Sequence, residues 1–190
     1  RYRSAIALDG KEPEAWLGLG DSERGRRRDG EAELAYQKAF AMPGARDRAL
    51  ARLFDLYKGQ DPARALALLD QNGSAALQAE GKRLKAELLQ EQADQLDKAG
   101  KLPQALTQRQ EALRLLPDDV WLAYRVAATQ ARLGDVAGGE RLLRGRLAGQ
   151  PQNDSLRYAT ALYLSGQDQS SQARAVLAEV PAARWSADMQ

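Results

Sequence analysis

Small and apolar residues recur at a period of 34 residues in the second half of the chain. The recurring positions are Gly100 and Gly134, Leu102 and Val136, Ala105 and Gly139, Pro117 and Pro151, and the series Ala93, Ala127 and Ala161. Within each period, apolar positions three and four residues apart predict amphipathic helices, and Gly or Pro predicts where a helix ends. A period of this length is typical of a repeat of two antiparallel helices, which buries its apolar face only against a neighbouring repeat.

Helical spacing continues along the whole chain. Asp118 or Asp119 is predicted to cap one helix, because a carboxylate there accepts hydrogen bonds from free backbone N–H groups. Gly20 lies inside another helix, where it costs about 1 kcal/mol relative to Ala, and this predicts the close approach of a second helix. The predicted helices cover residues 1–9, 13–27, 32–39, 45–58, 62–71, 75–99, 102–115, 119–133, 136–148, 154–165 and 169–180, with another starting at 182–190.

The repeat is interrupted between residues 60 and 84. Ala39 and Ala112 occupy the same place in the pattern but lie 73 residues apart, which is two periods plus five residues. The stretch 75–99 is either one long helix or two helices broken at Gly81, and we expect an irregular joint near Gly81. The predicted organisation is an N-terminal arm at 1–72 with a partial, a full and a short irregular repeat, an irregular joint and hinge at 73–84, and a C-terminal arm at 85–190 with three repeats and the start of a further helix.

The first complete repeat carries Trp16, Leu19 and Gly20 in its first helix. Together with the 34-residue period, these residues resemble the tetratricopeptide-repeat (TPR) family. The resemblance covers essentially the whole chain and implies an all-α fold, a TPR superhelical solenoid of antiparallel helix pairs. In that family the first helix of each repeat lines a concave groove.

The composition removes most kinds of catalytic chemistry. The chain has no Cys and no His, so it lacks thiol nucleophiles, most transition-metal sites and the commonest general base. Its carboxylates follow helical spacing, and no pair of them stands out in an apolar setting. We therefore predict that the chain is not an enzyme and has no catalytic residue, metal site or cofactor. The formal charge of +2 and the lack of an apolar run of about 18 residues predict no nucleic-acid partner and no membrane contact.

Four arginines lie at the turn that follows the helix at 13–27. Gly20 and Gly25, just before them, are spaced as in a phosphate-binding loop, but no strand precedes them and no Lys-Ser or Lys-Thr follows. The sequence therefore predicts a solvated turn, with an acidic partner or a phosphate surface as the alternative. The four residues are Arg24, Arg26, Arg27 and Arg28.

The candidate binding site lies on the groove side of the last repeats. The 34-residue alignment places Trp121 and Tyr124 there, with Tyr158 at the place of Tyr124 one repeat later, and Arg125 and Arg132 beside them. Neighbouring exposed aromatic residues are unusual in a chain with only 6% aromatic residues. Two interpretations stay open: the rings pack between repeats, or they form a stacking platform for a peptide or a sugar.

The last part of the chain adds a more specific set of residues. These are the segment 112–122, then Leu162, Tyr163, Leu164, Ser165, Gly166 and Asp168, then Pro181, Trp185, Met189 and Gln190. They resemble the periplasmic repeat region of the bacterial cellulose synthase C subunit, the outer-membrane component of cellulose export. In that family, a signal peptide precedes the repeat array and an outer-membrane β-barrel follows it, and we expect the present chain to be a piece of such a protein.

This second resemblance implies a non-catalytic periplasmic scaffold that links the inner-membrane synthase to the outer-membrane pore and assists glucan export. The implied partners are the other subunits of the cellulose synthase complex, with the glucan chain or peptidoglycan as further candidates. Two alternatives stay open: the repeat scaffold of another exopolysaccharide system, such as alginate, and a cytoplasmic peptide-binding TPR adaptor. Adaptors that hold a C-terminal carboxylate need cations in the groove, whereas the expected groove positions here are acidic and would repel it. They are Glu14, Asp21, Asp55, Glu87, Asp94 and Asp97.

Overall fold

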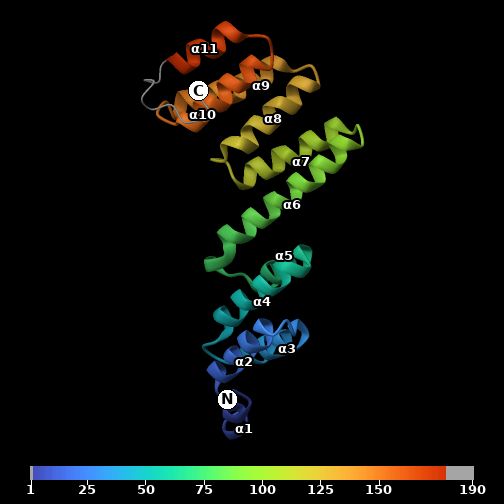
Figure 1. Ribbon diagram of the computed structural model, residues 1–190, viewed down its shortest axis with the longest axis vertical. Helices are drawn as coiled ribbons and strands as arrows, with labels where there is room; N and C mark the ends of the chain where they lie inside the picture. The colour runs from blue at the N-terminus through green and yellow to red at the C-terminus, as the bar shows by residue number, and fades with distance from the viewer. Residues whose placement is uncertain (1, 179–190) are drawn as a thin grey trace. The chain divides into compact units, whose positions relative to one another are not determined.

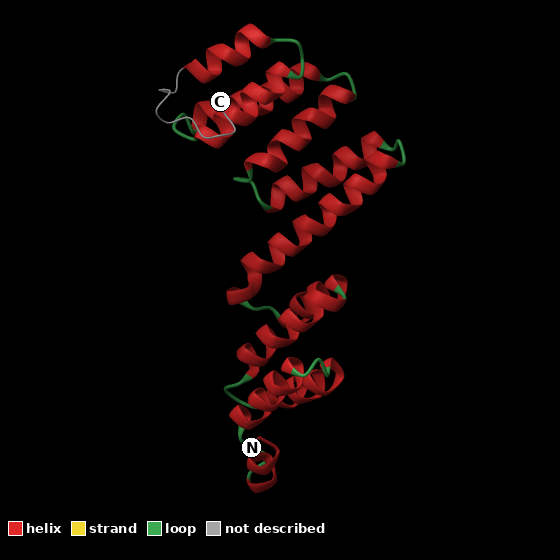
Figure 2. Ribbon diagram, in the orientation of Figure 1, coloured by secondary structure: helices red, strands yellow, loops and turns green. Residues whose placement is uncertain are grey.

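The structure is a computed structural model that describes residues 2–178, without the side chain of Leu8. Every regular element in this range is helical and no strand occurs among these residues (Figure 2). The elements are α1 (Tyr2–Leu8), α2 (Pro13–Gly25), α3 (Asp29–Phe40), α4 (Arg46–Gln60), α5 (Pro62–Asn72), the short 3-10 helix η1 (Ala75–Leu77), α6 (Gln78–Lys98), α7 (Leu102–Leu115), α8 (Val120–Arg132), α9 (Val136–Gly149), α10 (Asp154–Ser165) and α11 (Ser170–Ala178).

Successive helices form antiparallel pairs joined by short turns, from α2 with α3 to α10 with α11 (Figure 1). The predicted all-α TPR fold is confirmed, and the predicted bounds of α7 and α10 agree with the structure to the residue. The end of the predicted last helix at Val180, the stop at Pro181 and the segment that carries Trp185, Met189 and Gln190 lie outside the described residues.

Helix starts are set by local side chains. The carboxylate of Asp119 accepts hydrogen bonds from the backbone N–H groups of Trp121 and Leu122, both at 2.9 Å. Of the two predicted caps, Asp119 is therefore the one used. Asn153 caps α10 in the same way through the N–H of Leu156 at 3.0 Å. Such caps satisfy N–H groups that have no partner within the helix.

The turns inside most of the helix pairs share one backbone conformation. In four of the pairs within the described residues, the same turn position has a positive φ, the left-handed region that favours glycine. Each of these positions lies one period, or the long 73-residue interval, from the next. They are Arg27 (φ 60°), Gly100 (72°), Gly134 (93°) and Asp168 (59°).

The chain divides into two compact units, residues 1–84 and 85–190. The first unit has one apolar core shared by α2–α5, with Tyr36, Leu50 and Phe54 almost fully buried. A Cβ on Gly20 would lie 2.9 Å from Cζ of Tyr36 and closer still to two other ring atoms. The close helix approach predicted at Gly20 is therefore confirmed, and Tyr36 is the group that approaches.

Gly81 does not break the long helix. The irregular backbone is confined to Gly73, Ser74 and η1, and α6 runs without interruption from Gln78 to Lys98. A Cβ at Gly81 would lie 2.7 Å from Cδ1 of Leu69, so glycine here allows α5 to pack closely. One glycine costs a helix only about 1 kcal/mol relative to alanine, and the other residues of this long helix offset that cost. The prediction of an irregular backbone at Gly81 was therefore wrong, because the irregular residues precede α6. The predicted hinge over 73–84 stays a prediction.

In the part of the chain that the structure describes, the second unit holds α6 from Lys85 onward and α7 to α11, which pair as α6–α7, α8–α9 and α10–α11. Its core has the small residues of the 34-residue series at its centre, since Ala93, Ala127 and Ala161 are at most 3% exposed. Gly139 occupies the place of Ala105 one repeat later and lies against Tyr163 of α10. Small residues at these points let neighbouring helices approach closely. Among the described residues, no helix is both long and apolar enough to cross a membrane.

Candidate functional site

Three aromatic rings from two successive repeats meet at the start of α8. The ring of Trp121 lies 6.0 Å from that of Tyr124 and 6.2 Å from that of Tyr158, with interplanar angles of 76° and 75°. These are edge-to-face contacts, the geometry that aromatic quadrupoles favour. The indole is 47% exposed, while the tyrosines are partly buried beneath it. We call Trp121, Tyr124 and Tyr158 the aromatic platform.

A pocket of about 330 Å³ lies beside Tyr158, between α10 and α11. Its wall includes Ala173, which corresponds by the 34-residue period to Gly139. Gly139 is covered by Tyr163 of the next repeat, so the pocket is the kind of surface on which a further helix of an array packs. The pocket therefore has the character of a packing surface, and the aromatic platform stays the candidate binding site.

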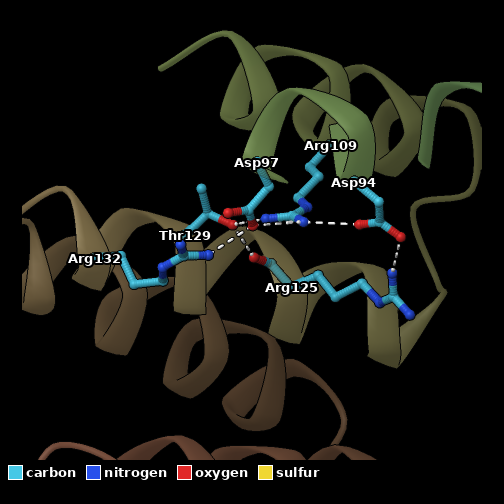
Figure 3. Close-up of polar contacts among 6 residues, drawn as sticks. All are labelled: Asp94, Asp97, Arg109, Arg125, Thr129 and Arg132. Carbon is cyan, nitrogen blue, oxygen red and sulfur yellow. Dashed lines mark hydrogen bonds and ion pairs between the residues drawn. The ribbon is translucent and has the colours of Figure 1, made fainter. Parts of the chain in front are cut away.

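The two arginines predicted beside the rings are engaged in ion pairs (Figure 3). Nη1 of Arg125 lies 3.4 Å from Asp94, and Nη1 of Arg132 lies 2.6 Å from Asp97. Both arginine side chains stay about half exposed, at 50% and 53%. Because a guanidinium carries five N–H donors, each arginine keeps donors that point to solvent.

Arg109 of α7 connects both aspartates from the buried side (Figure 3). Its Nη2 donates to Asp94 at 2.9 Å and to Asp97 at 3.1 Å, and its Nη1 donates to the hydroxyl of Thr129. The side chain is only 8% exposed. One buried cation thus joins α6, α7 and α8, and we call these six residues the Asp94–Asp97 network, with Arg125 and Arg132 as its outer members.

Sequence reasoning missed the role of Arg109, although a signal for it exists. Arg109 and Arg125 follow Asp94 by 15 and 31 residues. In the first unit, Tyr36 and Arg52 follow Asp21 at the same two spacings. There too the aspartate accepts from both partners, each at 2.8 Å. The recurrence of a polar triplet at the long 73-residue interval indicates a contact repeated between helices.

The network also corrects the expected charge of the groove. Six acidic residues were expected to repel a carboxylate, but Glu14 is paired with Arg48, Asp21 with Arg52, and Asp94 and Asp97 with the arginines of the network. Apart from Arg109, these arginines come from the next helix pair, 31 to 35 residues further on. The sequence of one helix shows its acidic residues but not the arginines that a neighbouring repeat places beside them.

Ion pairing lowers the pKa of Asp97. The hydrogen bond from Arg132 has the largest effect on this pKa. Burial has the next largest and opposes it, and the hydrogen bond from Arg109 lowers the pKa further. Because the folded-state pKa lies below the unfolded value of about 3.9, ionised Asp97 stabilises the fold above that value. This contribution is lost as the pH falls through the folded-state pKa.

Asp97→Asn is therefore expected to lower the free energy of unfolding at neutral pH and to leave it nearly unchanged at the lowest pH. The two pH profiles should converge below about pH 4, measured by urea titration at a series of pH values. Asp118→Asn, at an exposed position of the α7–α8 connection, serves as the control and should run parallel to the wild type. Parallel profiles for Asp97→Asn as well would contradict the assigned role of Asp97.

Three sets of comparisons relate this chain to known proteins. It is 32% identical over 140 residues to cellulose synthase operon protein C of Escherichia coli, covering 72% of this chain and 12% of that protein. The corresponding protein of Salmonella typhimurium is 32% identical over 144 residues, with the same coverage, and that of Pseudomonas fluorescens is 27% identical over 191 residues, covering 97% of this chain and 15% of the relative. No protein-family model matches the chain.

Solved structures of similar architecture include MamA, with a TM-score of 0.43 and 15% identity over 90% of each chain. Another is YrrB, described as a TPR protein with an unusual peptide-binding site, with a TM-score of 0.40 and 14% identity over 94% of this chain and 89% of that one. The chain spans only 12–15% of the length of the cellulose synthase operon relatives that it matches.

Proposed function

Because this chain is homologous to a segment of cellulose synthase operon protein C, we propose that it is a non-catalytic TPR scaffold of the bacterial cellulose synthesis and secretion machinery. Its place is the periplasm, where it links the synthase to the outer-membrane pore. The homology carries the connection to cellulose, and the repeat fold supports the scaffold role, since stacked helix pairs provide extended surfaces for partners. The partners are other subunits of the cellulose synthase complex, and the glucan chain touches the aromatic platform.

The exposed indole of Trp121 supports direct contact with glucan. The axial C–H groups of a β-linked glucose ring form an apolar face that matches the flat surface of an aromatic ring. Tyr124 and Tyr158 pack against the indole in edge-to-face contacts, so little conformational entropy is lost when a sugar stacks on it. The half-exposed arginines of the network supply N–H donors for sugar hydroxyls nearby.

Binding at this platform should be weak, with a dissociation constant on the order of 1 mM, or about −4 kcal/mol. One exposed ring offers a small contact area, and a chain that must move onward would stall on a tighter site. The platform therefore guides the glucan without retaining it, and the repeat array provides the mechanical connection.

Titration of cellopentaose into isotope-labelled protein, followed by NMR, tests this proposal. The indole N–H signal of Trp121 and the amide signals around it should shift, while the signal of Trp16 should not. Trp121→Ala combined with Tyr158→Ala should abolish the shifts. Leu133→Ala removes an exposed apolar side chain, 41% exposed, just after the same helix, and should leave the shifts unchanged.

Shifts that survive the double substitution, or that occur away from α8 and α10, would assign the three rings to inter-repeat packing alone. The chain would then be a spacer or a protein-docking arm. A parallel titration with an oligomannuronate of the same length separates cellulose from an acidic exopolysaccharide, because stronger binding of the acidic chain would favour an alginate-type system.

A further inference from the structure

A buried glutamate near the turn between α2 and α3 accepts hydrogen bonds from three arginines, two in the turn and one in α1. The side chain of Glu23 is 1% exposed. Its Oε1 accepts from Arg3 and from Arg26, both at 3.3 Å, and its Oε2 accepts from Arg28 at 3.5 Å. The three arginines are 59–69% exposed. Each guanidinium therefore directs one edge to the same carboxylate and leaves its other N–H groups facing solvent.

The turn carries more positive charge than this carboxylate neutralises. Residues 23–29 contain four arginines and two acids, and Arg3 adds a further cation, so the cluster has a net charge of +3. Asp29 accepts from Gln60, and Arg24 donates to a backbone carbonyl, that of Asp55, which does not neutralise it. Cations held this close repel one another, and a second anion would relieve that repulsion.

Arg27 is placed where the backbone favours a different residue. Its φ is 60°, and the equivalent turn positions in later repeats are Gly100, Gly134 and Asp168. A left-handed conformation costs a residue with a long side chain roughly 1 kcal/mol compared with glycine. The side chain is exposed and makes no hydrogen bond or ion pair with the described residues. An arginine that costs backbone energy and makes no contact within the described residues indicates a contact with another molecule.

We propose that this turn, with Arg3, Arg24, Arg26, Arg27 and Arg28, docks an acidic peptide segment of a protein partner. The three guanidinium groups around Glu23 already converge on a carboxylate, and planar forks of this kind match further carboxylates in the same way. A membrane surface fits less well, since residues 24–29 of the turn include no large apolar side chain that could enter a bilayer. The surface belongs to the first unit and is independent of the glucan platform.

Fluorescence anisotropy with a labelled, end-blocked hexaglutamate peptide and the whole chain tests this docking surface. Binding is expected in about 10 mM NaCl and should weaken strongly in about 150 mM, where the Debye length falls from roughly 30 to 8 Å. Arg26→Gln combined with Arg28→Gln should weaken the affinity about fivefold or more, as two exposed ion pairs contribute. Arg83→Gln with Arg141→Gln removes the same charge from exposed helix positions elsewhere and should change the affinity less than about twofold.

Arg27→Gly keeps the test valid if the first double variant folds poorly. It touches no partner of Glu23 and relieves the left-handed strain, so it should raise the midpoint of thermal unfolding and at the same time weaken peptide binding. Loss of affinity in a more stable protein cannot come from misfolding. Equal weakening by the control pair, no binding at low salt, or binding to phosphatidylcholine–phosphatidylglycerol vesicles without binding to the peptide would each overturn the proposal.

Discussion

Replacing Arg109 by methionine is expected to lower the free energy of unfolding by about 2–4 kcal/mol. The guanidinium is 8% exposed and donates to Asp94, Asp97 and Thr129. Removing one partner of a buried ion pair costs about 3–5 kcal/mol when the other charge is left unpaired. Here each aspartate keeps a second arginine on its outer side, so the expected loss extends below that range. Urea denaturation followed by circular dichroism measures it.

Arg114→Met provides the matched control on the same helix. Arg114 is 70% exposed and pairs with Glu111 at 2.8 Å, and exposed pairs of this kind contribute only about 0–1 kcal/mol. The two substitutions remove the same group from α7, and they differ in burial and in the helices that the arginine connects. Equal losses for both variants would show that the Asp94–Asp97 network adds nothing beyond an ordinary surface pair.

Gly139→Ala should lower the free energy of unfolding by about 1–3 kcal/mol. Alanine is favoured over glycine inside a helix by about 1 kcal/mol, so propensity alone predicts the opposite sign. A Cβ at this position, however, would lie 2.7 Å from the backbone carbonyl oxygen of Ala127 and closer still to the hydroxyl of Tyr163. The carbonyl cannot turn away as a side chain would, and that hydroxyl already donates to Val136 at 2.7 Å.

Gly145→Ala tests the same change in the same helix without the contact. A Cβ at Gly145 would have no atom within 4 Å, so only the propensity effect remains and stability should rise by about 0.5–1 kcal/mol. Opposite signs for two Gly→Ala changes on α9 are the expected result in urea denaturation. Stabilisation by both would show that α9 and α10 are not packed as closely as Gly139 and Tyr163 indicate.

The helices could be predicted from the sequence because their causes are local. Apolar spacing, the cap at Asp119 and the positive-φ glycines at 100 and 134 act within a few residues of the helix ends, and the predicted bounds of α7 and α10 are confirmed. The 34-residue period also placed Tyr158 one repeat after Tyr124, which anticipated that both rings meet Trp121. What the period could not show is how much of each ring faces solvent, since that depends on the packing of α8 against α10.

Only the tertiary structure decided which charges meet. Asp97 lies beside Glu91, Asp94 and Lys98 in the sequence, but its partners are Arg109 and Arg132, 12 and 35 residues away. The same holds for Gly81, where an irregular joint was expected and the structure has a packing contact with Leu69 of another helix. Helix formation depends on interactions over three or four residues, whereas ion pairs and close contacts between helices depend on the register in which the helices stack. The sequence by itself determined the helices and their period, and the stacking register determined the network around Arg109, the exposure of Trp121 and the contact of Arg3 with Glu23.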